Sequence, residues 1–279
     1  MDAPDPVVSS GPGAAGREDA RLAALARYAI LDTPPEQDFD DLARLAAQLC
    51  GTPVGLITFV DDTHQFFKSR IGFDGAADAP LDAGFCPVVV RRGVPLVIPD
   101  VVSDPAHAGN PACANGVRFY AGTPLLTPDG KVIGTLCVLD GVPRPQGLSE
   151  THLDALAALA RQVMSQLELR RETQERRRGE QAFRQLANVV PQIVWAADPE
   201  GKLTFFNEQW ANYTGFTFDP EQGDGIVARY VHPDDLPHTL AAFGAALRSG
   251  QRLELEHRMR AAGGEYRWFL VRAMPTAIR

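Results

Sequence analysis

The residues from 149 to 189 constrain the fold most, because they carry a helical pattern between two stretches whose short apolar runs are typical of β-strands. Ser149 is a candidate N-cap at the start of this segment. A helix that continued to Val189 would span about 60 Å, at a rise of 1.5 Å per residue. The sequence therefore predicts an α+β protein of two domains, each with a central antiparallel sheet flanked by helices, joined by a long helical linker.

Apolar residues in the first half of this linker follow the 3-4-3-4 spacing of a coiled-coil seam. They are Leu153, Leu156, Ala160, Val163 and Leu167. We expect two copies of the chain to pair along this seam as a homodimer. An apolar stripe of Phe183, Leu186 and Val190 resumes out of phase with the seam after a polar stretch. A solvated connector without a signalling role is the alternative interpretation.

Composition and charge narrow the class of protein. The formal net charge of −8 argues against nucleic acid as a partner, since phosphate binding needs a basic surface. No apolar run reaches the roughly 20 residues that a membrane helix needs, and the N-terminus lacks a secretory signal. We therefore expect a cytoplasmic protein without a membrane partner. Residues 1–17 are rich in Pro, Gly, Ala and Ser, which predicts a disordered tail.

Residues 18–148 predict an antiparallel sheet preceded by two helices. The first helix is expected from about Glu18 and the second over Phe39–Leu49, since the intervening prolines cannot continue a helix. Strands are expected at residues 53–60, 64–71, 95–99, 119–126 and 131–139. The last of them is apolar on both alternating faces, which predicts a central strand covered on both sides. We expect helices on one face of this sheet and loops on the other.

Residues 190–279 predict a second α+β domain. Its expected elements are a hairpin over 193–206, a short helix over 207–213 stopped at Gly215, a helix from His232 to about Arg248, and strands over 253–260 and 265–274. Leu253, Leu255, His257 and Met259 alternate with charged residues, as in a half-buried strand.

The first domain resembles the GAF family of sensory domains. The matching stretches, in order over residues 20–167, are YAILDTPPEQDFDDLARLAAQLCGTPVGLITFVDD, HQFFKSRIG, FCPVVV, DVVSDPAHAGNP and VRFYAGTPLLTPDGKVIGTLCVLD. Over residues 183–279, VVPQIVWAADPEGKLTFFNEQWANYTGF, VHPDD and LELEHRMRAAGGEYRWFLVRAMP resemble a PAS domain. The expected order is a tail (1–17), a GAF-like domain (18–148), a helical linker (149–189) and a PAS-like domain (190–279).

This resemblance implies modules that sense a ligand or a partner and bias an attached output domain through the linker. In such proteins the output is most often a histidine kinase of a two-component system, and less often a cyclic dinucleotide enzyme. The chain has neither a phospho-acceptor motif nor a GG(D/E)EF-like signature. We therefore expect no enzyme in this segment itself. A ligand-free scaffold that serves dimerisation is the alternative.

Each domain offers candidates for a ligand pocket. In the GAF-like domain they are Phe85, Cys86, Phe119, Tyr120 and Cys137, and plain core packing is an equally good explanation. In the PAS-like domain they are Trp195, Phe206, Asn207, Trp210, Tyr213 and Trp268. Core packing without a ligand is the favoured interpretation of these aromatic residues. Asn207 is expected to cap the short helix that it begins.

The sequence also argues against several cofactors. The four cysteines form no CxxC pair and have no histidine at metal-ligand spacing, so we expect no metal site. A covalent flavin would require a cysteine in the PAS-like domain, but all four cysteines precede residue 140. A covalent bilin in the GAF-like domain would require a cysteine followed by histidine, and none of the four is followed by one. We therefore expect neither cofactor. Haem needs an axial histidine. We expect His232 to belong to a helix-start motif and His257 to be a half-buried strand residue, so neither needs a haem to account for its presence. The ligand, if there is one, stays unknown.

One enzymatic alternative concerns the cysteines. A GAF subgroup reduces free methionine sulfoxide with cysteines around its pocket, and Cys86 with Cys113 is the candidate pair here. The apolar settings of Cys86 and Cys137 instead predict raised thiol pKa values and unreactive thiols.

Overall fold

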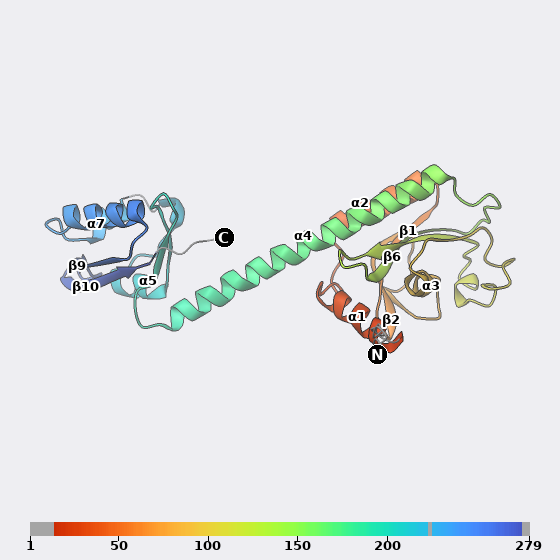
Figure 1. Cartoon of the computed structure of the whole chain (residues 1–279), viewed down its shortest axis with the longest axis horizontal. Coiled ribbons are helices and arrows are strands. Elements are labelled where there is room, and N and C mark those ends of the chain that lie inside the picture. The colour runs from red at the N-terminus through yellow and green to blue at the C-terminus, as the bar shows by residue number, and fades with distance from the viewer. Residues whose placement is uncertain (1–13, 223–224, 275–279) are drawn as a thin grey trace, which may run out of the picture. The chain divides into compact units, whose positions relative to one another are not determined.

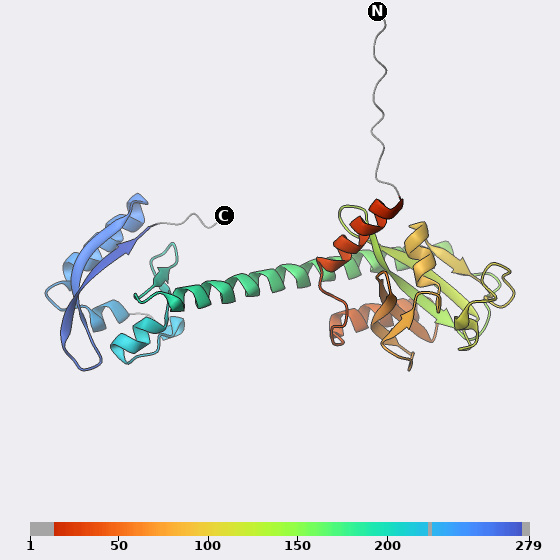
Figure 2. The same cartoon turned by 90° about the horizontal axis from the view of Figure 1, so that it is seen from below.

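The computed structural model describes residues 14–222 and 225–274, which form two compact units divided after Glu175. We call them the N-terminal unit and the C-terminal unit; Figures 1 and 2 show their elements. Most of the predicted tail lies outside the described residues. Its last four residues, 14–17, already belong to a helix that the sequence analysis started near Glu18. Two alanines begin this helix, and alanine is the strongest helix former.

The N-terminal unit is built on a six-stranded antiparallel sheet with the strand order β3-β2-β1-β6-β5-β4. Its strands are β1 (Val54–Val60), β2 (His64–Ile71), β3 (Asp78–Pro80), β4 (Leu96–Ile98), β5 (Phe119–Leu126) and β6 (Val132–Asp140). The central strand β6 is buried along its length except at its ends, as its two apolar faces predicted. The short edge strand β3 was not predicted, because it contains no apolar run.

Each face of this sheet has its own core. Helices α1 (Ala14–Ala26), α2 (Gln37–Leu49) and the first half of α4 (Glu150–Val189) pack on one face. The other face carries α3 (Cys86–Arg92), a 3-10 turn (Pro111–Cys113) and loops. Only loops were predicted there, so α3 is an addition to the expected arrangement.

Helix α4 is continuous from Glu150 to Val189, as the sequence predicted. The Oγ of Ser149 accepts a hydrogen bond from the backbone N–H of His152 at 3.3 Å, so Ser149 caps the helix. Residues 175–186 of this helix are all exposed. The helix therefore begins as part of the N-terminal unit and continues as a solvated element.

The strands of the C-terminal unit form two antiparallel pairs. They are β7 (Trp195–Ala197) with β8 (Leu203–Phe206), and β9 (Leu253–Arg260) with β10 (Tyr266–Ala273). Within the described residues the pairs are separate sheets, where the sequence analysis expected one central sheet. The helices are α5 (Glu208–Thr214), α6 (Ile226–Tyr230) and α7 (Leu236–Ser249), with a 3-10 turn at Pro220–Gln222.

Glycines end two of these helices where the sequence predicted. Gly215 follows α5 at φ 73°, and Gly250 follows α7 at φ 64°, a left-handed conformation that favours glycine. The start of α7 differs from the prediction, since the helix begins at Leu236 rather than His232. The carboxylate of Asp235 accepts hydrogen bonds from the backbone and guanidinium of Arg258 and does not cap the helix.

Candidate functional site

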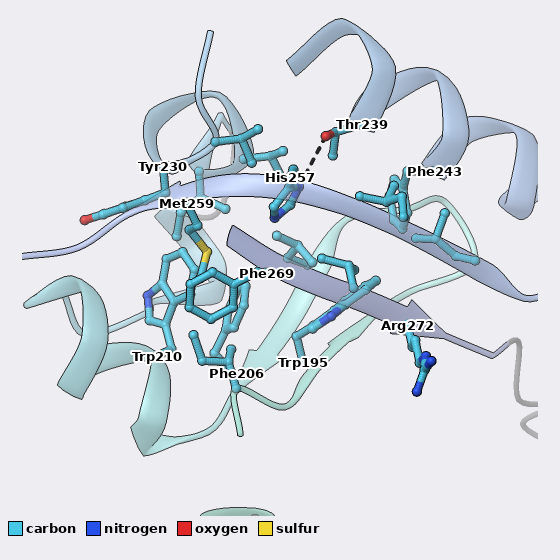
Figure 3. A pocket seen from close by; sticks show the side chains of 18 of the residues that line it. Trp195, Phe206, Trp210, Tyr230, Thr239, Phe243, His257, Met259, Phe269 and Arg272 are labelled. Atoms are coloured by element: carbon cyan, nitrogen blue, oxygen red, sulfur yellow. Dashed lines mark hydrogen bonds between the residues drawn. The ribbon is translucent and has the colours of Figure 1, made fainter. Parts of the chain in front are cut away.

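A cavity of about 1140 Å³ lies in the C-terminal unit, between the two strand pairs and helices α5 to α7 (Figure 3). All but one of the residues predicted for this pocket line it: Trp195, Phe206, Trp210, Tyr213 and Trp268. Trp268 lies at the rim, since it is 66% exposed and the guanidinium of Arg258 covers its ring. Asn207, the remaining predicted residue, is not part of the lining.

Aromatic rings in contact with one another form the walls of this cavity. The ring centroids of Phe206 and Trp210 are 4.2 Å apart, and those of Trp210 and Tyr230 are 4.9 Å apart. Elsewhere on the wall, the rings of Trp195 and Phe243 lie 5.9 Å apart. Aromatic contacts of this kind stabilise a core and also present flat apolar surface to a ligand.

Strand β9 supplies the inner wall through its alternation. Leu253, Leu255, His257 and Met259 are buried, and the charged residues between them are more exposed, as the sequence predicted. His257 therefore enters the cavity by its position in the strand. It is the one titratable side chain among the four.

His257 is buried, with an exposed fraction of 7%. Its Nδ1 lies 3.2 Å from Oγ1 of Thr239 on α7, and this hydroxyl donates to the carbonyl oxygen of Asp235 at 3.0 Å. Burial lowers the pKa of His257, and the negative charge of Asp235 opposes that effect. The imidazole is therefore neutral at pH 7. Across the described residues, His, Cys, Asp and Glu side chains form no group that could hold a metal ion.

Asn207 joins α5 to the end of α4. Its Nδ2 donates to the carbonyl oxygens of Ala187 and Gln192, both at 2.8 Å, and its Oδ1 accepts from the N–H of Val194 at 2.9 Å. The predicted helix cap is wrong, since the side chain of Asn207 makes no hydrogen bond to α5. These three bonds take up both amide hydrogens and the oxygen, so the side chain serves residues 187–194 instead.

In the N-terminal unit the structure gathers all but one of the predicted pocket residues. Phe85, Cys86, Tyr120 and Cys137 share the core under α3, and the rings of Phe85 and Tyr120 are 5.0 Å apart. Phe119 belongs to the opposite core, against the helices. Neighbouring residues of a strand point to opposite faces, so Phe119 and Tyr120 of β5 could not share one pocket.

Two sulfur atoms meet inside this core. The Sγ atoms of Cys86 and Cys137 are 3.7 Å apart, and the hydroxyl of Tyr120 donates to Cys86 at 3.6 Å. The hydrogen bond with Cys137 lowers the pKa of Cys86, and the same bond, with burial, raises the pKa of Cys137. The sequence analysis expected raised values at both. Cys113 contacts the carbonyl oxygen of His107 instead, so the sulfur that meets Cys86 is that of Cys137.

The predicted dimer seam faces its own domain. Leu156, Ala160, Val163 and Leu167 are at most 4% exposed and belong to the core formed with α1, α2 and the sheet. Leu153 is half-buried. The expectation that these side chains pair with a second chain is therefore wrong, because this chain's own sheet already buries four of them. A 3-4-3-4 spacing marks one buried helix face and does not say what covers it.

Polar contacts also hold α4 to the N-terminal unit, and the sequence analysis missed them. Oε1 of Glu36 accepts from Nζ of Lys68 at 2.6 Å and from Nε of Arg170 at 2.9 Å. Burial raises the pKa of Glu36, but these hydrogen bonds outweigh it and hold that pKa below its ordinary value. The hydroxyl of Tyr28 donates to the carboxylate of Glu168, which lies two residues before Arg170 in α4. The available signal was Lys68 next to Phe66 and Phe67 in a predicted strand.

Among the described residues, no helix combines the length and the apolar character needed to cross a membrane.

Comparisons with known proteins match both units. A family model described as GAF domain matches residues 34–167, and one described as PAS fold matches residues 203–277. A cyclic di-GMP phosphodiesterase of Pseudomonas aeruginosa is 32% identical over 159 residues, which are 56% of this chain and 27% of the relative. A peroxide stress-activated histidine kinase of Schizosaccharomyces pombe is 32% identical over 102 residues, 34% of this chain and 6% of the relative. The chain spans 27% or less of the curated relatives that it matches.

Solved structures resemble part of this chain. A free methionine-R-sulfoxide reductase of Neisseria meningitidis is 20% identical, covers 59% of this chain and 96% of its own, and gives a TM-score of 0.42. A GAF domain from a phosphoenolpyruvate-protein phosphotransferase of Coxiella burnetii is 15% identical, covers 58% and 99%, and gives a TM-score of 0.43. Neither likeness bears on ligand or activity.

Proposed function

The chain carries a GAF domain followed by a PAS domain, and from this premise we propose that it is the sensory input part of a multidomain signalling protein. In this proposal a ligand or partner changes the GAF or PAS domain, and α4 passes the change between them. The relatives that support it are signalling proteins. The two domains are sensory modules, so we propose that this segment has no catalytic centre of its own.

The observation that carries the proposal is how α4 is held at its two ends. Val163 and Leu167 are buried in the GAF core, and Arg170 is bound to Glu36 one turn later. At the other end, Asn207 of the PAS domain binds the carbonyl oxygen of Ala187. A rearrangement of either core must therefore break these contacts or move the helix. A continuous helix resists bending, which favours movement.

We propose that the output enzyme is a histidine kinase or a cyclic di-GMP enzyme. The relatives from Schizosaccharomyces pombe and Dictyostelium discoideum are histidine kinases, and the relative from Pseudomonas aeruginosa is a cyclic di-GMP phosphodiesterase. The family resemblance favours the kinase. The extent of the match favours the phosphodiesterase instead, because that relative matches a larger share of this chain than the kinases do. We propose a cytoplasmic location for the whole protein.

Homodimerisation remains part of the proposal, with a different contact. The stripe of Phe183, Leu186 and Val190 on and after α4 is 50%, 71% and 39% exposed, so it is accessible to a second copy where the original seam is not. Native mass spectrometry on residues 1–279 tests this pairing. We expect twice the chain mass for the wild type and a monomer for Leu186→Glu. A wild-type monomer would refute it, and mass beyond whole chains would reveal a retained ligand.

Hydrogen–deuterium exchange on the whole chain tests the relay. Glu36→Gln weakens the hold on α4, and we expect faster exchange in residues 187–207 as well as in the GAF domain. Adding Arg178→Pro, which breaks the exposed part of α4, should confine the effect to the GAF domain. Asp41→Asn, which removes an exposed ion pair with Arg44, is the matched control. Unchanged exchange in residues 187–207 of Glu36→Gln would refute the relay.

A further inference from the structure

We propose that the PAS cavity binds an uncharged aromatic molecule that donates one hydrogen bond to Nε2 of His257. This inference rests on the proposed sensory function and names the chemical class of its ligand. It follows from the hydrogen bonds of His257, from the charges around the cavity and from the shape of its walls.

The hydrogen bonds of Thr239 indicate which nitrogen of His257 carries the proton. A threonine hydroxyl has one hydrogen, and we assign that of Thr239 to the nearer acceptor, the carbonyl oxygen of Asp235, which also accepts the backbone N–H of Thr239. With this assignment the hydroxyl oxygen accepts towards His257, and Nδ1–H is the donor in the 3.2 Å contact. In a neutral imidazole the other nitrogen, Nε2, is then an acceptor without hydrogen.

The surroundings keep this imidazole neutral. Burial lowers the pKa of His257. Asp235 is the acid that acts against this, but its carboxylate is bound to the guanidinium of Arg258 at 2.8 and 2.9 Å. Arg258 therefore compensates much of the negative charge of Asp235. That charge does little to stabilise a protonated His257.

Nε2 faces the cavity without a partner. Figure 3 shows one ring nitrogen of His257 joined to Thr239 and the ring directed towards the aromatic residues of the cavity. No hydrogen bond to Nε2 occurs within the described residues, and Phe269, the cross-strand neighbour of His257, has no polar side-chain atom. A hydrogen-bond donor on a ligand in the cavity would satisfy this acceptor.

The charges of the lining exclude a charged ligand. Glu200, Lys202 and Arg272 are its charged residues, and all three are exposed at the surface. Arg272 is bound to Glu254 at 3.2 Å. A charge placed beside His257 would therefore lose its water without gaining an opposite charge, which is costly.

The walls favour a flat ring. Trp210, Phe206 and Trp195 line the space with aromatic faces and edges, against which a flat aromatic ring can stack. The volume of about 1140 Å³ accepts a molecule of two or three fused rings.

The test compares two ligands that differ in one hydrogen-bond donor, 2-naphthol and 2-methoxynaphthalene. Isothermal titration calorimetry measures their affinities for the whole chain, and tryptophan emission reports the site, because all three tryptophans line this cavity. We expect 2-naphthol to bind about tenfold more tightly, the ratio that corresponds to one additional hydrogen bond of about 1.4 kcal/mol.

Variants assign this preference to His257. His257→Phe removes the acceptor, so we expect equal affinities for the two ligands. His232→Phe, a change at a histidine outside the cavity lining, should keep the tenfold preference. Thr239→Val leaves Nδ1 without its acceptor and lets the proton move to Nε2, so the preference should fall there too, even if His257→Phe does not fold.

Three results would overturn the inference: equal binding of both ligands to the wild type, a preference retained in both His257→Phe and Thr239→Val, or no binding of either ligand. None of them touches the relay through α4, which the exchange experiment measures without ligand. Tight, donor-dependent binding together with an unchanged exchange pattern in Glu36→Gln would keep this inference and refute the relay through α4.

Discussion

Asn207 and Glu36 each satisfy hydrogen-bonding groups on a segment distant from their own. Asn207 holds residues 187–194, and Glu36 holds Lys68 and Arg170. A buried group that loses such a partner costs more than the bond itself contributes. Substitutions at these two positions should therefore have effects that their exposed neighbours lack.

Replacing Asn207 distinguishes the observed role from a helix cap. At an N-cap, aspartate is as favourable as asparagine. Here Asn207→Asp would place a carboxylate against two carbonyl oxygens, so we expect it to lower the unfolding free energy of the PAS domain at least as much as Asn207→Ala, by about 2–3 kcal/mol. Urea unfolding followed by tryptophan emission measures this. A fully stable Asn207→Asp would show that the residue acts as a cap.

Glu36 should make the GAF domain sensitive to acid. Its pKa lies below the ordinary value of 4.5 in the folded state. As the pH falls below that value the unfolded chain takes up the proton first, so the unfolding free energy decreases. We expect Glu36→Gln to cost about 2 kcal/mol at pH 7 and to show a smaller further loss towards pH 3.5. Far-UV circular dichroism during urea unfolding at each pH checks this, with Asp41→Asn as the control. Parallel pH curves for Glu36→Gln and wild type would contradict it.

The sequence predicted the contacts of some of these side chains but not of others. Apolar type alone suggested Tyr120 and Cys137 for a pocket, and they do meet Cys86 in one core. The alternation of β5 was also available in the sequence and places Phe119 on the opposite face. The partners of Asn207 and Glu36 were not predictable, because they depend on which distant carbonyl oxygens and cations the fold brings near.

At the scale of elements, α4 changes its role along its length. Its first half is a core helix of the GAF domain, and residues 175–186 are exposed. The apolar spacing predicted the helix correctly but predicted the wrong element packed on its apolar face. The same spacing occurs whether that face packs on a partner helix or on the chain's own sheet. The strands of the same domain were easier to predict, because short apolar runs bounded by turn residues are typical of strands.

Truncating Leu156 should act on the GAF domain rather than on dimerisation. Leu156 is 2% exposed, so Leu156→Ala leaves a cavity and should cost about 2–5 kcal/mol of GAF stability. Leu169, on the same helix but 57% exposed, is the control, and Leu169→Ala should change stability by less than about 0.5 kcal/mol. Urea unfolding by circular dichroism measures both. Loss of dimers from Leu156→Ala at unchanged stability would restore the coiled-coil interpretation.

Gly179 weakens the exposed part of α4. Glycine in a helix costs about 1 kcal/mol relative to alanine, and apart from the adjoining residues and backbone of the helix itself, no atom of the described residues lies within 4 Å of the position that a Cβ would occupy. We expect Gly179→Ala to slow amide exchange in residues 176–186 about fivefold. Mass-spectrometric exchange measures this, and Gly179→Pro should have the opposite effect. Unchanged exchange in the alanine variant would mean that neighbouring contacts already fix this part of the helix.

At the scale of the whole molecule, each domain has its own hydrophobic core. Two clusters, on the two faces of the six-stranded sheet, belong to the GAF domain, and a third, around Trp210 and Tyr230, belongs to the PAS domain. The sequence anticipated this division, because the strand patterns stop before residue 149 and resume only after the helix. Its separate strand pairs in the PAS domain were not anticipated, since strand patterns alone do not fix which strands pair.

Separate cores should unfold in separate steps. All three tryptophans belong to the PAS domain, so tryptophan emission follows that domain alone, and far-UV circular dichroism follows both. We expect the two signals to give different urea midpoints, which a two-state molecule cannot do. Leu156→Ala should then shift the dichroism curve and leave the tryptophan midpoint unchanged, and Asn207→Ala should do the reverse.

The outcome also bears on how α4 carries a signal. If Leu156→Ala moved both midpoints together, the domains would share one cooperative unit, and α4 would transmit by stability as well as by position. If the midpoints stay independent, the helix joins two domains that fold alone, and a signal has to travel as a change in the contacts of Glu36 and Asn207. The second outcome is expected, because residues 175–186 bury little surface through which unfolding of one domain could destabilise the other.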